Sequence, residues 1–385
     1  MDAKLLPGLQ AADVTDPILL AVIDLWQMRH DSDKDIAQDR PLAELEAQRS
    51  RFAANPALFD YLLAAHAWFI DGKPAEVVRL IAAEPPGERL SYLQFSRQLL
   101  RALALDRLGD PGAREALTRL IPAATRPYQS GALELAIAMS DERRGQVDRV
   151  FETGSPVRHA GIRDILLRHA AGPGLLRRQA AAAADPAQTE ARWALYILLY
   201  KDLTRGAYAD FAQDLKRLPA KPAAPAAGDD HARDPAEPDL TVFAWSNSDG
   251  DFPCPSLSEL AARLGRNPHA VTPHLCLGEF ARLNGFDHSN LDNPPPADEL
   301  GGAPSGFPGG VFSRMAIYQS VIADTAAPAP AKAYALYRAI YCYAPSGNSD
   351  CGDPDVPVSQ RKAWFRMLKT QYASSPWAAD LKVYW

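Results

Sequence analysis

The feature that most constrains the fold is a series of helix patterns in the first 218 residues, each closed by a glycine. In each pattern apolar residues recur three and four positions apart, as they do on one face of an amphipathic α-helix. A shorter helical pattern follows each glycine. The spacings between the turn glycines are 37, 36, 27 and 34 residues, and these glycines are Gly72, Gly109, Gly145, Gly172 and Gly206. We therefore predict a succession of helical hairpins.

The first hairpin shows how the residues set its limits. A long helix is expected over 58–69, Gly72 allows a left-handed turn, and Pro74 begins a short helix over 75–83. The other predicted pairs are 91–108 with 113–121, 129–143 with 146–151, 156–170 with 175–184, and 189–203 with 207–218. Hairpins spaced by about 34 residues are typical of tetratricopeptide-like solenoids, whose stacked units leave a concave groove.

The hairpin pattern stops at residues 219–238, where Ala, Pro and Asp dominate without apolar periodicity. We expect a linker or long loop there. The predicted organisation is a helical-repeat solenoid over 1–218, this linker, and a loop-rich helical lobe over 239–385. In the lobe, 285–310 is rich in Pro and Gly, and such long loops are often functional. Helices of the lobe are expected at 256–264, 273–284, 313–324, 329–343, 359–372 and 375–382.

The four cysteines all lie in the predicted lobe, at Cys254, Cys276, Cys342 and Cys351. An even number in turn-rich sequence favours two disulfides, and four cysteines allow three pairings. Because Cys342 and Cys351 flank a short turn-rich stretch, we expect that pair together with Cys254–Cys276. The alternatives are four reduced buried thiols and a tetrahedral zinc site, although the usual C-x2-C spacing of zinc sites is missing. Disulfides would indicate an oxidising compartment.

The net charge and the length of the apolar runs limit the classes of partner that we expect. The net charge of -6 lacks the basic excess of nucleic-acid binders, so no nucleic-acid partner is expected. The apolar run 18–23 ends at Asp24, well short of the roughly 18 residues that span a bilayer. No signal peptide is recognisable at the N-terminus. Since the cysteines favour export, we expect a periplasmic or outer-membrane-associated protein without its export signal, and a lipid anchor lost with that signal is left open.

The C-terminal stretch 364–381 places the bulky pair Trp364-Phe365 on a predicted helix, followed by Tyr372, Ser374 and Trp377 around a turn. This stretch resembles tetratricopeptide proteins of the bacterial envelope, namely outer-membrane assembly lipoproteins of the BamD (YfiO) type and Tol–Pal accessory proteins. Ala373 stands where that family usually has proline. The resemblance implies an envelope-type helical repeat, and it does not extend to a role in outer-membrane protein assembly.

Familiar catalytic motifs are missing, among them H-E-x-x-H, G-x-S-x-G and the phosphate-binding and dinucleotide-binding glycine loops, so no catalytic residue is predicted. No cofactor is expected, with one alternative. Asn247, Asp249 and Asp251 place oxygen atoms at alternate positions, which can begin a calcium site. Phe252 and Ser258 stand where an EF-hand needs Gly and Glu, so an Asx-rich turn is the other interpretation.

The remaining candidate binding residues lie in the lobe. Asp287, His288 and Asp292 gather in one loop, where they would act as acid, base or ligand, or belong to a solvated turn. Glu279, on an otherwise apolar helix, is either a buried carboxylate with a raised pKa or a salt bridge at the rim. Three tryptophans are candidate ligand contacts, with core packing as the alternative, and these are Trp245, Trp377 and Trp385.

Three functional hypotheses follow from these patterns. The first is a non-catalytic repeat scaffold of the periplasm or outer membrane, which binds an envelope protein partner or an outer-membrane complex. The second is a glycan- or peptidoglycan-binding protein that uses the aromatic residues and acidic loops of the lobe. The third is an unrecognised enzyme with carboxylates in 284–299.

Overall fold

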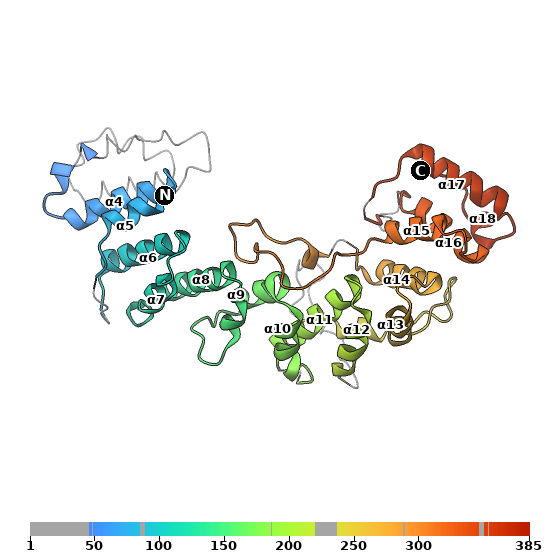
Figure 1. Cartoon of the computed structure of the whole chain (residues 1–385), viewed down its shortest axis with the longest axis horizontal. Helices are drawn as coiled ribbons and strands as arrows, with labels where there is room; N and C mark the ends of the chain where they lie inside the picture. Colours follow the sequence, from blue (N-terminus) through green and yellow to red (C-terminus); the bar gives the residue numbers. More distant parts are fainter. Residues whose placement is uncertain are drawn as a thin grey trace. The chain divides into compact units, whose positions relative to one another are not determined.

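The computed structural model describes residues 46–47, 49–84, 89–185, 187–219, 237–287, 289–345, 350–352 and 354–385. These residues form α-helices and short 3-10 or π turns without any strand, which confirms the predicted all-α class. One isolated antiparallel bridge joins Asn247 to Cys254. The chain divides into two compact units, Met1–Ile162 and Arg163–Trp385 (Figure 1).

In the first unit long helices alternate with short ones. Each helix packs on the next in chain order, from α4 to α8, and the long helices α4, α6 and α8 are also neighbours in turn. Helices that are adjacent in the sequence are therefore neighbours in space from α4 to α8. The described elements are η1 (Arg49–Phe52), α4 (Pro56–Phe69), α5 (Pro74–Leu80), α6 (Tyr92–Arg107), α7 (Ala113–Thr118), η2 (Ile121–Ala123), α8 (Pro127–Arg143), η3 (Val147–Phe151) and the start of α9 (Ala160–Ile165).

The predicted turn glycines explain where most of the long helices end. Gly72, Gly109 and Gly145 have φ angles of 61°, 75° and 66°, the left-handed region in which glycine has no Cβ penalty. Gly206 closes the corresponding long helix of the second unit with φ 76°. Gly172 was expected to do the same, but its φ is -84° and it precedes the first residue of a helix.

Small residues allow the hairpins of the first unit to pack closely. Ala64, Ala65 and Ala67 of α4 are fully buried, and they belong to one apolar cluster with Val77 and Ile81 of the next hairpin arm. Since alanine leaves little side chain between two backbones, these residues allow the helices to approach each other closely.

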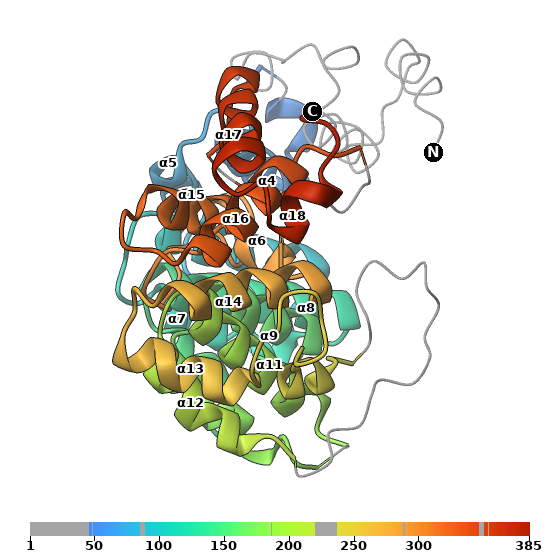
Figure 2. The same ribbon diagram turned by 90° about the vertical axis from the view of Figure 1, so that its right-hand side faces the viewer.

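The second unit continues the packing in chain order. Each helix from α10 to α17 contacts the next, and Figure 2 shows α12, α13 and α14 one above another. Its elements are η4, a π turn (Leu166–Ala170), α10 (Pro173–Gln179), η5 (Ala180–Ala182), α11 (Thr189–Thr204), α12 (Tyr208–Asp214), η6 (Leu215–Arg217), η7 (Leu240–Ala244), α13 (Leu257–Arg266), α14 (Val271–Asn284), η8 (Asn290–Asp292), α15 (Arg314–Ala323), α16 (Ala329–Tyr341), α17 (Val358–Gln371) and α18 (Pro376–Asp380).

The predicted linker at 219–238 falls inside this second unit. Residues 220–236 lie outside the described residues. Helices α12 and α13, which flank these residues in the sequence, pack directly on each other. Gly265 of α13 lies so close to α12 that a Cβ placed on it would be 3.6 Å from the backbone nitrogen of Ala209.

Two disulfides cross-link the second unit, and both are the predicted pairs. Cys254–Cys276 joins the loop before α13 to α14, and Cys342–Cys351 joins the end of α16 to the following loop. The Cα atoms are 5.5 Å apart in both, within the usual range. Of the helices in the described ranges, none has the length and apolar character needed to cross a membrane.

The long segment between α14 and α15 is docked on the second unit, where it runs over α11 and η4 (Figure 1). The Gly306 nitrogen donates to the Ala170 oxygen (2.9 Å) and the Phe312 nitrogen to the Thr204 oxygen (2.9 Å). Gly309 has φ 88°, and a Cβ there would lie 2.9 Å from the Arg205 oxygen. The glycines of this segment therefore permit backbone contacts that larger residues would prevent.

Candidate functional site

An apolar stripe is exposed on two neighbouring helices of the first unit. Its residues on α8 follow their counterparts on α6 by 36 residues, which is also the spacing of Gly109 and Gly145. Positions separated by seven and eleven residues share one face of a helix. The residues of this α6–α8 stripe are Tyr92, Leu99 and Leu103 on α6, and Tyr128, Leu135 and Met139 on α8.

The exposure of this stripe is unusual for large apolar side chains. Tyr92 is 58% exposed, Tyr128 64% and Leu135 40%, and the other three residues are partly buried. The two halves meet where α6 and α8 contact each other, and Tyr92 and Tyr128 are hydrogen-bonding neighbours across this contact. Contiguous exposed apolar and aromatic residues of this kind are typical of protein-interaction sites.

Arginines stand at both ends of the α6–α8 stripe. At one end the Arg126 Nε donates to the Tyr92 hydroxyl (3.1 Å), and Tyr92 is also a hydrogen-bonding neighbour of Tyr128. At the other end lie Arg107 and Arg143, again 36 residues apart. Arg126 at one end and the exposed Arg107 at the other therefore place positive charge beside the stripe.

A buried carboxylate pairs with Arg143 at this second end and offsets its charge. Asp106 is buried and accepts hydrogen bonds from Ser140, Arg143 and Arg144. Burial alone would raise its pKa, but these hydrogen bonds and the charge of the arginines outweigh burial and lower it. Asp106 is thus an ionised anchor for two arginines inside the hairpin stack.

A separate pocket of about 260 Å³ lies on another face of α8. Leu133 and Ile137 of α8 line it together with Ile121 and Pro156. At its rim the Glu134 carboxylate accepts hydrogen bonds from the backbone nitrogens of Arg158 and His159, both at 2.6 Å. Since this carboxylate is engaged in fixing the loop before α9, the pocket is a weaker candidate than the stripe.

A buried polar cluster lies in the second unit between α11 and the docked segment. The Tyr200 hydroxyl donates to Asp292 Oδ2 (2.5 Å), and an Arg205 Nη2 lies 3.8 Å from Asp292 Oδ1. Burial raises the pKa of Asp292, although Tyr200 and Arg205 oppose this shift. Asp292, predicted as a ligand or catalytic acid, therefore anchors the loop to the helix.

Lys201 is the most unusual member of this cluster. Its side chain is fully buried, and its Nζ has no hydrogen-bond partner among the described residues. Burial, and then the neighbouring Arg205, lowers the pKa of Lys201 to about 7. Burial, Lys201 and Arg168 together lower the pKa of His169 to about 4. No opening to this cluster is apparent in the described residues, because the docked segment covers it.

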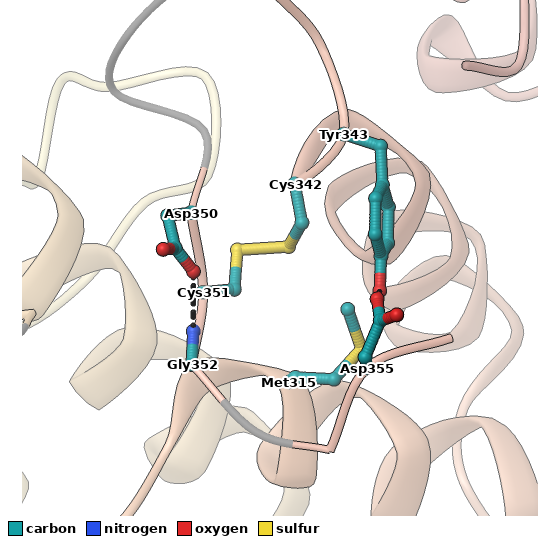
Figure 3. A pocket seen from close by; sticks show the side chains of 7 residues that line it. All are labelled: Met315, Cys342, Tyr343, Asp350, Cys351, Gly352 and Asp355. Carbon is teal, nitrogen blue, oxygen red and sulfur yellow. Dashed lines mark hydrogen bonds between the residues drawn. A yellow bond between two sulfur atoms is a disulfide. The ribbon is translucent and has the colours of Figure 1, made fainter. Parts of the chain in front are cut away.

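A small pocket of about 170 Å³ adjoins the Cys342–Cys351 disulfide (Figure 3). Its wall is held by Tyr343, whose hydroxyl donates to Asp355 Oδ1 (2.8 Å) and accepts from the Val356 nitrogen (2.6 Å). The Arg361 guanidinium stacks on the same ring, 3.9 Å from its centroid. These partners indicate that the polar side chains here fix the loop after the disulfide.

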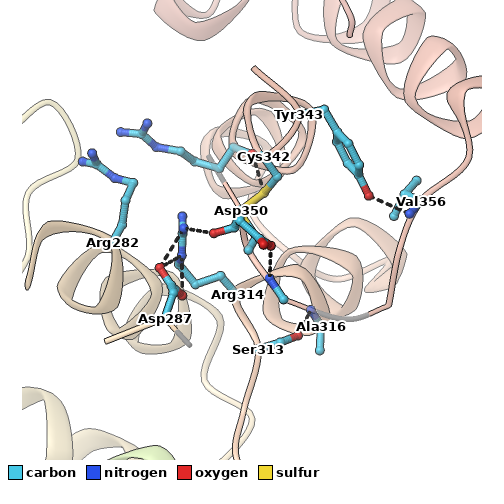
Figure 4. Close-up of a disulfide and its surroundings, with 12 residues drawn as sticks. Arg282, Asp287, Ser313, Arg314, Ala316, Cys342, Tyr343, Asp350 and Val356 are labelled. Carbon is cyan, nitrogen blue, oxygen red and sulfur yellow. Dashed lines mark hydrogen bonds and ion pairs between the residues drawn. A yellow bond between two sulfur atoms is a disulfide. The ribbon is translucent and has the colours of Figure 1, made fainter. Parts of the chain in front are cut away.

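The predicted loop residues Asp287 and Asp292 do not share a site. Asp287 forms an ion pair with Arg314, whose Nε lies 2.9 and 2.8 Å from its two carboxylate oxygens. Arg314 also donates to the Asp350 backbone oxygen (2.7 Å) (Figure 4). This one arginine of α15 therefore links the loop that carries Asp287 to the loop of the second disulfide. Asp292 instead bonds Tyr200. His288 lies outside the described residues.

The predicted acidic loop is a tight turn. Asn247 and Cys254 exchange two backbone hydrogen bonds (3.2 and 2.9 Å), and the Asn247 side chain donates to the Phe252 oxygen (3.5 Å). Asp249 and Asp251 are exposed. Within the described ranges, no three His, Cys, Asp or Glu side chains are grouped as a metal site requires. The calcium hypothesis stays a prediction.

The candidate tryptophans take part in ring packing. Trp245 lies 5.5 Å from the Phe280 ring, Trp377 lies 4.8 Å from Tyr334, and Trp385 lies 5.3 Å from Tyr341. All three are partly buried. The C-terminal tail is therefore docked on the aromatic core of α16, and these rings have part of their area in protein contacts.

Glu279 forms a predicted salt bridge, but it is buried and does not lie at the rim. It is only 2% exposed, and it pairs with Arg282 (2.8 Å) and Arg338 (3.2 Å). Burial would raise its pKa, but the hydrogen bond from Arg282 and the charge of Arg338 lower it overall. The raised pKa that the apolar helix pattern suggested is therefore wrong, because two arginines reach the buried carboxylate.

The α6–α8 stripe was not among the predicted site residues. The 36-residue repeat carried a signal for it, since Tyr92 and Tyr128 occupy the same position before consecutive turn glycines. Exposure could not be read from that pattern, because the same pattern describes a helix face that another segment covers.

Comparisons with protein-family models, curated proteins and solved structures found no match for this chain.

Proposed function

We propose that this protein is a non-catalytic, tetratricopeptide-like repeat scaffold that binds a protein partner on its α6–α8 stripe. The observation that carries the proposal is the exposure of Tyr92, Tyr128 and Leu135 at repeated positions of neighbouring helices. Aromatic residues dominate the energetics of protein interfaces, since they bury a large rigid area at a low cost in conformational entropy.

The proposal places the protein in the periplasm or at the outer membrane. Two observations support this placement. Two disulfides are typical of chains that fold in an oxidising compartment. The stretch 364–381, which resembles envelope repeat proteins, forms α17, a turn and α18, and Ser375 caps α18 by accepting a hydrogen bond from the Ala378 nitrogen.

The stripe is a better candidate for the binding site than the aromatic residues of the C-terminal lobe. Trp245, Trp377 and Trp385 already pack on other rings, whereas Tyr92 and Tyr128 expose more than half of their surface. A glycan platform needs exposed ring faces. The geometry therefore favours a binding site on the first unit over a glycan platform on the C-terminal lobe.

The test is an affinity capture from envelope extract of the native host, with mass spectrometry. The tagged wild-type chain is compared with a Tyr128→Ser, Leu135→Ser variant and with a control, Val358→Ser, which changes a 53% exposed residue of α17. We expect a partner that the wild type and the control retain and the stripe variant loses. Identical sets of captured proteins for all three chains, with the same helical circular dichroism, would show the proposal to be wrong.

A further inference from the structure

Helix α11 of the second unit carries a stripe in the same register as the α6–α8 stripe. Gly206 closes α11 as Gly145 closes α8, and it follows Gly145 by 61 residues. Counting the same 61 residues from Leu135 and Met139 leads to Tyr196 and Tyr200. These two tyrosines form the α11 stripe, which corresponds to the part of α8 that is open to solvent.

In contrast to the α6–α8 stripe, the α11 stripe is covered. Phe243 of η7 packs on Tyr196 with ring centroids 5.4 Å apart, and Phe286 packs on Tyr200 at 5.0 Å. Tyr200 is only 1% exposed. The segments that cover Tyr196 and Tyr200 are therefore an example of what can pack on these helix positions.

The covering segment between Phe286 and Asp292 combines two contacts. The Phe286 ring supplies the apolar contact, and Asp292, six residues later, accepts the hydrogen bond from the Tyr200 hydroxyl at 2.5 Å. Its described backbone is a loop with one short 3-10 turn, η8. A hydrogen bond to a carboxylate is stronger than one between neutral groups, so the acidic residue fixes the register of the covering segment.

The first unit presents matching groups without a cover among its described residues. The hydroxyls of Tyr92 and Tyr128 lie beside the Arg126 guanidinium at one end, and the exposed Arg107 stands at the other. Positive ends around an apolar centre complement a segment that carries acidic residues beside an aromatic one.

We propose that the α6–α8 stripe binds a non-helical segment of a partner protein that carries an aromatic residue and an acidic residue a few positions apart. The aromatic ring lies between α6 and α8, and the carboxylate accepts hydrogen bonds from the tyrosine hydroxyls and Arg126. This inference rests on the proposed function, since it names the chemistry of the partner for the same stripe.

The experiment is a selection from a random twelve-residue peptide library displayed on phage, with the full chain as the target. Peptides are then sorted by whether they still bind the Tyr128→Ser, Leu135→Ser variant. We expect the stripe-dependent peptides to be enriched in Phe, Tyr or Trp with Asp or Glu within about seven positions. Their affinity should fall at least about tenfold for an Arg126→Gln chain, and also when salt is raised from low to high ionic strength.

The outcomes separate the two proposals. Stripe-dependent peptides that lack acidic residues, or that are basic, would overturn the inference about chemistry and leave the protein-binding stripe in place. No stripe-dependent peptide at all would count against both. Sedimentation of the wild type and the stripe variant tests whether a second copy of this chain occupies the stripe. A dimer that forms with the wild type and not with the variant would identify that second copy as the occupant and overturn the inference.

Discussion

Replacing Lys201 with methionine tests the buried cluster beneath the docked segment. The lysine is fully buried, and its Nζ has no hydrogen-bond partner in the described part of the chain. Methionine has a similar length and no charge to bury. We therefore expect the Lys201→Met variant to be more stable than the wild type, although the substitution removes a charge that lies near Asp292.

The magnitude follows from the pKa. Burial lowers the pKa of Lys201 from 10.5 to about 7, and each unit corresponds to about 1.4 kcal/mol, so the charged lysine costs the folded state about 4–5 kcal/mol below pH 7. Because the folded pKa lies below the unfolded one, this penalty disappears as the pH rises from 7 to 10.5. After allowance for imperfect packing of the thioether, we expect a gain of about 2–4 kcal/mol at pH 7 that vanishes near pH 10.5.

The assay is urea unfolding followed by tryptophan fluorescence, which reports mainly on the second unit because tryptophans 193, 245, 364, 377 and 385 lie there. Lys216→Met, at an exposed lysine, is the control and should change stability by less than about 0.5 kcal/mol. A Lys201→Met variant that is less stable than the wild type, or a difference that is the same at pH 7 and 10, would refute the reasoning. Either result would mean that the Nζ has a partner that stabilises its charge.

Further predictions concern the same unit. The pKa of His169 is lowered to about 4, so the wild type should lose up to about 3 kcal/mol as the pH falls from 6.5 to 4, and His169→Gln should lose less in urea titrations at both pH values. Arg314→Met should cost about 3–5 kcal/mol by leaving Asp287 without its partner, and adding Asp287→Asn should recover part of that loss in a double-mutant cycle by thermal unfolding. Gly309→Ala, at φ 88° and close to the Arg205 oxygen, should cost about 1–3 kcal/mol and speed amide hydrogen exchange at Phe312.

Local chemistry made much of the fold predictable. Gly109 and Gly145 could be assigned as helix ends because only glycine adopts their left-handed conformation without strain. Cys342 and Cys351 could be paired because the stretch between them is too short and turn-rich to keep the two sulfurs apart. Both predictions rest on residues that are close in sequence.

Other features of the structure could be predicted only in part. Glu279 has a lowered pKa because Arg282, three positions away, donates a hydrogen bond to it and Arg338, 59 positions away, adds its charge. No local pattern records the second contact. Asp292 is an anchor because Tyr200 lies beneath it. Gly172 does not close a helix with a left-handed turn, because it is the extended residue before Pro173, which begins α10.

The most direct test of the central claim is photo-crosslinking in the native host with a photoreactive phenylalanine analogue at position 128. The same analogue at position 358 serves as the control, since both natural residues are more than half exposed. We expect a discrete crosslinked protein at position 128 that is missing at position 358 and is weakened by Leu135→Ser. No crosslink at position 128, or the same products at both positions, would contradict the claim that the α6–α8 stripe binds a protein partner.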